Sequence, residues 1–127
     1  MNENQFKRDK MLLLYDSDTI YFEQKSSSLL EKEKNKIDLI VKYLNLHPEY
    51  SLRIEGHADA LGKVKDNLEL SKRRAEKVKQ YIANQGISGN RLKVFAYGEK
   101  KQIEPCINCS SERRKPNRRV ELIIEKE

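Results

Sequence analysis

Apolar residues recur with two different periods along the chain, and these periods predict strands and helices. Alternation of apolar and polar residues predicts strands at 52–56, 92–96 and 120–124, because successive side chains of a strand point to opposite faces of a sheet. A β-prone run predicts a further strand at 19–22. Apolar or small residues at helical spacing predict two amphipathic helices. Their stripes are Leu30, Ile37, Ile40, Val41 and Leu44 in the first helix, and Leu68, Ser71, Ala75, Val78 and Ile82 in the second.

Local signals mark where these helices begin and end. Ser28 and Glu31 have the spacing of a capping box, and Asp66 opens a second capping signal. Pro48 disfavours helical geometry at the residue before it and is expected to stop the first helix. Gly86 can adopt the left-handed conformation that ends many helices, so we expect the second helix to stop there.

The predicted order of elements is β-α-β-α-β-β. Two helices of this length cover one face of a sheet, so the predicted fold is an α/β two-layer sandwich. Strands joined by helices should run parallel with right-handed crossovers, whereas the last strand follows a loop without a helix and should run antiparallel, which makes the sheet mixed. We interpret residues 1–18 as a linker or leader, with 11–15 as a candidate extra edge strand, and 19–127 as the domain.

Composition and charge agree with one folded domain and leave the partner open. The 127 residues are 37% hydrophobic and 36% charged, which suits a single modest core. The net charge is +6, and the concentrated basic run at 113–119 allows a nucleic-acid-binding hypothesis. No aromatic residue interrupts this run to stack on bases, which weakens that hypothesis. No apolar run approaches the roughly 20 residues of a membrane-spanning helix.

A candidate binding cleft lies at the end of the 52–56 strand. Asp59 follows that strand, where ligands often bind in α/β folds. Asn67 and Arg74 are seven residues apart, so at about 100° per residue they share one face of the second helix. A carboxylate, an amide and a guanidinium suit a zwitterionic ligand. The alternative is that Asp59 pairs with Arg74 or only caps a turn.

The residues around this cleft carry a family resemblance. The sequence Ile54-Glu55-Gly56-His57-Ala58-Asp59 resembles the signature of OmpA-like peptidoglycan-binding domains, which include peptidoglycan-associated lipoproteins. The resemblance covers about residues 19–125. The further matching positions are Gly62, Asn67, Leu70-Ser71-Lys72-Arg73-Arg74-Ala75, Val78, Ile20-Tyr21-Phe22, His47-Pro48-Glu49-Tyr50, Gly86-Ile87, Tyr97-Gly98-Glu99 and Asn117-Arg118-Arg119-Val120. The fold of this family is the same β-α-β-α-β-β two-layer domain.

The resemblance implies a ligand and the residues that hold it. Members of the family bind the peptide stem of peptidoglycan noncovalently. By this resemblance, Asp59 receives the ammonium of the diaminopimelate centre and Arg74 receives its carboxylate, while Asn67 and Arg118 match supporting positions. Glu23 matches the first of two family carboxylates after the first strand, and Lys25 reverses the charge of the second. The neighbours of Arg118 in the basic run are then expected to be solvated surface. His57 is expected to have a structural role and not a catalytic one, and His47 is expected to lie on the surface.

Cys106 and Cys109 lie in a long segment between the last two strands. Their spacing allows a disulfide, a redox dithiol or half of a zinc site. The chain has no second pair of cysteine or histidine ligands at suitable spacing for structural zinc. A thioredoxin-like motif should open a helix, and no helical pattern follows here. A structural disulfide in an oxidising compartment is therefore the simplest interpretation.

Taken with the resemblance, the sequence predicts a noncatalytic module that anchors an outer-membrane protein or lipoprotein to the cell wall from the periplasm. The predicted partner is diaminopimelate-containing peptidoglycan, with other envelope proteins open as partners, and no cofactor, metal or nucleic acid is expected. The chain as given shows no export signal, so the lipid anchor, β-barrel or repeat region that precedes such a module remains open. The alternatives are a basic nucleic-acid-binding protein and a CxxC thiol oxidoreductase.

Overall fold

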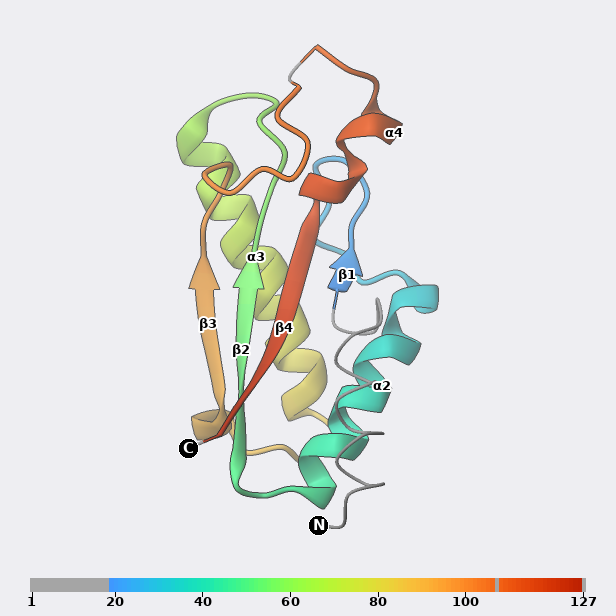
Figure 1. Ribbon diagram of the computed structural model, residues 1–127, viewed down its shortest axis with the longest axis vertical. Coiled ribbons are helices and arrows are strands. Elements are labelled where there is room, and N and C mark those ends of the chain that lie inside the picture. Colours follow the sequence, from blue (N-terminus) through green and yellow to red (C-terminus); the bar gives the residue numbers. More distant parts are fainter. Residues whose placement is uncertain (1–18, 107, 127) are drawn as a thin grey trace.

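The chain forms a four-stranded sheet with two long helices against one face (Figure 1). The structure is a computed structural model that describes residues 19–106 and 108–126. The strands are β1 (Thr19–Tyr21), β2 (Tyr50–Gly56), β3 (Leu92–Ala96) and β4 (Arg119–Lys126), and the long helices are α2 (Glu31–Leu46) and α3 (Val64–Ala83). The short helical turns are η2 (Gly89–Arg91), α4 (Ser111–Arg114) and η3 (Lys115–Asn117). The predicted α/β two-layer fold is confirmed.

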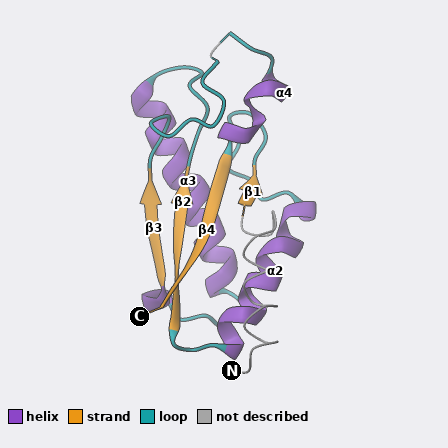
Figure 2. Ribbon diagram, in the orientation of Figure 1, coloured by secondary structure: helices purple, strands orange, loops and turns teal. Residues whose placement is uncertain are grey.

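The sheet is mixed, with strand order β1-β4-β2-β3. β2 and β3 are parallel, and β4 runs antiparallel to both β1 and β2, as predicted for a last strand without a crossover helix. The carboxyl ends of β1, β2 and β3 therefore meet the start of β4 at one end of the sheet. Figure 2 shows the loops after these strands gathered there, together with α4.

The core lies between the sheet and the two helices. Alternate residues of the strands and one stripe of each helix are buried in a single cluster, which confirms the two predicted periods. Its members from the strands are Ile20, Leu52, Ile54, Leu92, Val120 and Leu122, and those from the helices are Ile37, Ile40, Val41, Leu44, Ala75, Val78 and Ile82. Leu68, predicted to belong to the second stripe, is exposed, and Leu70 is buried instead. The stripe of α3 also contains Asn67 and Arg74, so it is only partly apolar.

The predicted capping signals are wrong, whereas the predicted helix ends are confirmed. α2 has Leu30 as its N-cap and α3 has Lys63, and neither helix has a side-chain cap. Most of the stability of these helices therefore comes from the packing of their apolar faces on the sheet. α2 ends at Leu46 ahead of Pro48, and Gly86 adopts a φ of +96° three residues after α3 ends.

The segment between β3 and β4 contains α4 and η3, although the sequence predicted no helix there. A single turn is too short to show a helical period. Ser110 caps α4, since its hydroxyl accepts a hydrogen bond from the Arg113 N–H at 3.2 Å. Cys106 and Cys109 form a disulfide ahead of it, which confirms the predicted pairing.

The segment 1–18, interpreted as a linker or leader with a candidate strand at 11–15, lies outside the described residues. Within the described part of the chain, no helix combines the length and apolar character needed to cross a bilayer.

Candidate functional site

Asp59 is buried in the loop that follows β2, with 6% of its surface exposed. Its Oδ1 accepts a hydrogen bond from the Leu61 N–H at 3.3 Å. Its Oδ2 lies 3.5 Å from Arg114 Nε and 3.5 Å from Arg118 Nη1. Among the described residues, Oδ2 has no hydrogen-bond partner. Asp59 therefore caps a turn through one oxygen, while its other oxygen is buried in ion pairs with two guanidinium groups and accepts no hydrogen bond from the described residues.

Arg74 of α3 is fully buried and ties three parts of the chain together. Its guanidinium donates to the carbonyl oxygens of Ser26 at 2.8 Å, His57 at 2.9 Å and Glu23 at 3.0 Å. Burial lowers the pKa of Arg74 to about 10, although the charge of Asp59 raises it and that of Arg118 lowers it further. Arg74 thus fixes the loop after β1 to the end of β2. Nη1 and Nη2 each carry a second N–H.

Arg118 lies just before β4 and is also buried. Its Nε donates to the Phe22 carbonyl at 2.9 Å, and its Nη1 donates to the Ser111 carbonyl at 2.8 Å. These bonds connect the end of β1 to α4. They also hold the guanidinium beside Asp59.

Arg114 of α4 also lies beside Asp59, and the sequence did not predict this neighbour. It was expected to be solvated surface, but only 7% of it is exposed. Its Nη1 donates to the Cys109 carbonyl, and its Nη2 donates to the Gln24 side chain at 3.2 Å. The sequence offers no signal for this burial, because the residue lies in a loop without periodicity.

The basic run is largely built into the fold. Asn117 and Arg119 are buried, besides Arg114 and Arg118. The Asn117 side chain accepts bonds from the N–H groups of Ile103 and Glu104 at 2.8 and 2.9 Å. The expectation of solvated surface is therefore wrong for Arg114, Asn117 and Arg119, whereas Arg113 is exposed as expected.

Asn67 lies on the same face of α3 as Arg74, as predicted, and is buried. Its Nδ2 donates to Glu99 Oε1 at 3.0 Å. Asn67 also lines a cavity of about 270 Å³ beside the loop after β2. The other lining residues are Lys25, Leu61, Gly62, Lys63, Asp66, Leu70 and Arg73.

Glu23 contributes to this region through its backbone. Its side chain is exposed, while its carbonyl accepts the bond from Arg74. Lys25, two residues later, has a φ of +57° and is exposed on the rim of the cavity. The structure therefore brings Asp59, Arg74 and Arg118 together, and adds Arg114 to them.

The two histidines are both more buried than their sequence contexts suggested. His57 is fully buried and its ring stacks on Tyr97 with a centroid separation of 5.3 Å. Burial lowers the pKa of His57 to about 4, and the positive charge of Arg119 acts in the same direction. His47, expected on the surface, is half-buried and packs 4.4 Å from the Tyr43 ring.

One acidic group among three buried cations defines the chemistry of the Asp59 cluster, by which we mean Asp59, Arg74, Arg114 and Arg118. A carboxylate binds an ammonium group, and guanidinium N–H groups bind a carboxylate through charge-assisted hydrogen bonds. The cluster is therefore suited to a ligand that carries both charges.

Comparison with known proteins identifies relatives of this chain. The chain is 35% identical over 100 residues to the peptidoglycan-associated lipoprotein of Rhizobium meliloti (strain 1021), a match that covers 77% of this chain and 57% of that protein. It is 32% identical over 109 residues to outer membrane porin F of Pseudomonas aeruginosa, covering 85% of this chain and 31% of the porin. The chain spans a little over half the length of the peptidoglycan-associated lipoproteins that it matches.

Solved structures share the fold. The C-terminal domain of Helicobacter pylori MotB superimposes with a TM-score of 0.75 at 28% identity, over 87% of this chain and 86% of that one. The peptidoglycan-associated lipoprotein of Burkholderia pseudomallei gives a TM-score of 0.79 at 24% identity, over 85% and 90% of the two chains. Residues 21–118 match the OmpA family. The chain belongs to the OmpA family.

Proposed function

We propose that this domain binds peptidoglycan without catalysis and that the Asp59 cluster is its ligand site. The observation that carries the proposal is Asp59 Oδ2, a buried carboxylate oxygen at the loop end of the sheet with no hydrogen-bond partner among the described residues. Burial of such an oxygen is costly unless a donor satisfies it. The relatives named for their association with peptidoglycan support the choice of ligand.

The finer proposal is that the ligand is the diaminopimelate centre of the stem peptide. Its ammonium would donate to Asp59 Oδ2, and its carboxylate would accept from the remaining N–H groups of Arg74. Arg118 and Asn67 are proposed as supporting contacts. By the family resemblance, Glu23 matches the first of two carboxylates after the first strand, and its exposed side chain would have to turn toward the ligand.

Attachment to the wall gives the domain a place in the envelope. We propose that it acts in the periplasm and links an outer-membrane protein or lipoprotein to peptidoglycan. The peptidoglycan-associated lipoproteins and porin F among its relatives support this placement. The basic run favours nucleic acid less, because Arg114, Arg118 and Arg119 are buried and bonded within the protein.

A pull-down with purified peptidoglycan sacculi tests the proposal. We expect Asp59→Asn, which keeps the size of the side chain and removes its charge, to lower affinity about ten- to a hundredfold, because a charge-assisted hydrogen bond contributes about 1.5–3 kcal/mol. Glu69→Gln is the matched control, since Glu69 lies exposed on α3 and the variant makes the same change in net charge. Equal binding by wild type and a folded Asp59→Asn variant would exclude the Asp59 cluster as the site.

A further inference from the structure

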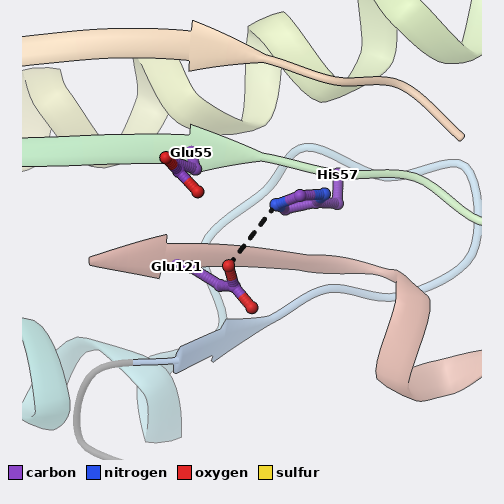
Figure 3. Close-up of side chains that lie close together, drawn as sticks. All are labelled: Glu55, His57 and Glu121. Carbon is purple, nitrogen blue, oxygen red and sulfur yellow. Dashed lines mark ion pairs between the residues drawn. The ribbon is translucent and has the colours of Figure 1, made fainter. Parts of the chain in front are cut away.

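The sheet face that carries no helix holds three possible metal ligands close together. Glu55 lies on β2, His57 follows that strand directly, and Glu121 lies on β4 in register with Glu55 (Figure 3). One ligand atom from each residue lies within 4.8 Å of the other two. Strand pairing, and not sequence proximity, brings Glu121 to the other two residues.

The imidazole ring of His57, the histidine of this group, is buried, and neither of its nitrogens has a hydrogen-bond partner among the described residues. Its Nε2 faces Glu121 Oε2 at 3.7 Å, beyond hydrogen-bond distance (Figure 3). The stacked Tyr97 ring holds the imidazole in place. Buried polar atoms without a partner are uncommon. The unprotonated nitrogen of a neutral imidazole is a preferred ligand of zinc.

The two carboxylates are each held by an arginine through one oxygen. Arg53 donates to Glu55 Oε2 at 2.8 and 3.1 Å, and Arg119 donates to Glu121 Oε1 at 3.0 Å. The other oxygen of Glu121 faces His57. Carboxylates that bind metals are commonly oriented by such outer hydrogen bonds. The arginines therefore orient both carboxylates, each through one of its oxygens.

We propose that Glu55, His57 and Glu121 form a binding site for a divalent transition-metal ion, with Zn²⁺ as the fitting ion. One imidazole and two carboxylates give three protein ligands, and water completes a tetrahedron. Calcium and magnesium prefer oxygen ligands alone. With bonds of about 2.0–2.2 Å the ligand atoms would lie roughly 3.4 Å apart, so metal binding draws the three side chains slightly closer, and the Glu121 side chain, 34% exposed, has room to rotate.

This metal site is independent of the proposed peptidoglycan function. It uses none of the side chains of the Asp59 cluster and lies on the open face of the sheet. The cationic Arg53, Arg119 and Lys101 surround it and repel a metal ion, whereas the two carboxylates attract one. The metal would join β2 to β4 across their register.

Calorimetric titration of the EDTA-treated, dialysed chain with zinc chloride tests the proposal. We expect one Zn²⁺ per chain, and at least about tenfold weaker binding by His57→Gln and by Glu121→Gln. Glu121→Gln changes a partly exposed side chain and serves where His57→Gln fails to fold. His47→Gln is the matched control, because His47 is the other histidine of the chain and it also lies beside a carboxylate, 3.4 Å from Glu49. This variant should bind as wild type does.

A second measurement locates the ion. Bound metal stabilises the folded chain, so Zn²⁺ should raise the Tm of wild type and of His47→Gln, and at the same Zn²⁺ concentration it should raise the Tm of Glu121→Gln by less. The imidazole nitrogen resonances of His57 should shift on addition of one equivalent of Zn²⁺. Absence of binding by the wild type, unchanged affinity in Glu121→Gln, or loss of binding in His47→Gln would each overturn the proposal.

Discussion

At the residue scale, Arg74 contributes to the stability of the fold as well as to the proposed ligand site. It is fully buried and donates to three backbone carbonyls from two loops. We expect Arg74→Ala to lower the free energy of unfolding by about 3–5 kcal/mol, because it leaves these three carbonyls without their charged donor. Urea unfolding followed by circular dichroism measures the loss.

A matched variant separates this role from charge in general. Arg73→Ala removes the neighbouring arginine, which is exposed on α3, and should change stability by less than about 0.5 kcal/mol. An Arg74→Ala variant as stable as Arg73→Ala would show that Arg74 does not hold the two loops together.

Folding stability is expected to depend on pH through the titration of His57. Its pKa is lowered to about 4 by burial and by Arg119 and Lys101, against the opposing effect of Glu55, while Glu121 also faces the ring. The unfolded chain therefore binds this proton more readily than the folded one. Stability should fall as the pH drops from about 6.5 toward 4, by at most about 1.4 kcal/mol per pH unit from this group.

Urea unfolding at a series of pH values in EDTA measures this dependence. His57→Gln should show a shallower fall in stability over the same pH range, because glutamine does not titrate. Parallel profiles for wild type and the variant would contradict the assignment of the slope to His57.

The candidate site was only partly predictable from its residues. The position of Asp59 after a strand and the shared helix face of Asn67 and Arg74 follow from local spacing, which sequence alone reports. Arg114 was missed because its burial depends on a one-turn helix in a loop. The group of Glu55, His57 and Glu121 was missed because only the pairing of β2 with β4 brings Glu121 beside His57.

The contact between β2 and α3 governs the site at the element scale. Gly56 ends β2, and a Cβ at this position would lie 1.9 Å from the Ser71 carbonyl oxygen of α3. We expect Gly56→Ala to push α3 from the sheet and to lower the free energy of unfolding by about 1–3 kcal/mol or more. Sacculus binding should also weaken, since β2 leads to Asp59 and α3 carries Arg74. Urea unfolding and the pull-down measure the two effects.

Gly89 provides the control for this substitution. A Cβ there would meet no atom within 4 Å, so Gly89→Ala should leave stability within about 0.5 kcal/mol of wild type. If Gly56→Ala proves as stable as Gly89→Ala, close packing of α3 on the end of β2 does not constrain the fold.

The elements themselves were largely predictable, whereas the N-terminal caps of the two long helices were not. Period-two strands and helical stripes are properties of consecutive residues, so β2, β4 and both long helices could be inferred. The alternation at 52–56 predicted one buried face, yet Glu55 and His57 of the opposite face are buried too. Arg53, Tyr97 and Glu121 cover them, and these residues come from different parts of the sheet.

At the scale of the whole molecule, a basic domain could attach to an anionic wall by charge alone, and ligand selectivity separates that case from a specific site. The net charge is +6, and general attraction of this kind is screened by salt. A specific site would distinguish diaminopimelate stems from stems with lysine, because lysine keeps the ammonium and lacks the carboxylate. The guanidinium that should bind this carboxylate would then lose its ligand partner.

We therefore expect soluble muropeptides with lysine to bind at least about tenfold more weakly than those with diaminopimelate, because a charge-assisted hydrogen bond of about 1.5–3 kcal/mol is lost. Amidation of the carboxylate should act similarly, since a neutral amide cannot accept a charge-assisted bidentate pair. Added salt should weaken the binding of both muropeptides and preserve the ratio of their affinities, because the difference in affinity arises at buried groups. Isothermal titration calorimetry measures these affinities. Equal affinity for lysine and diaminopimelate stems would contradict a site that grips both charges and would leave general attraction as the basis of binding.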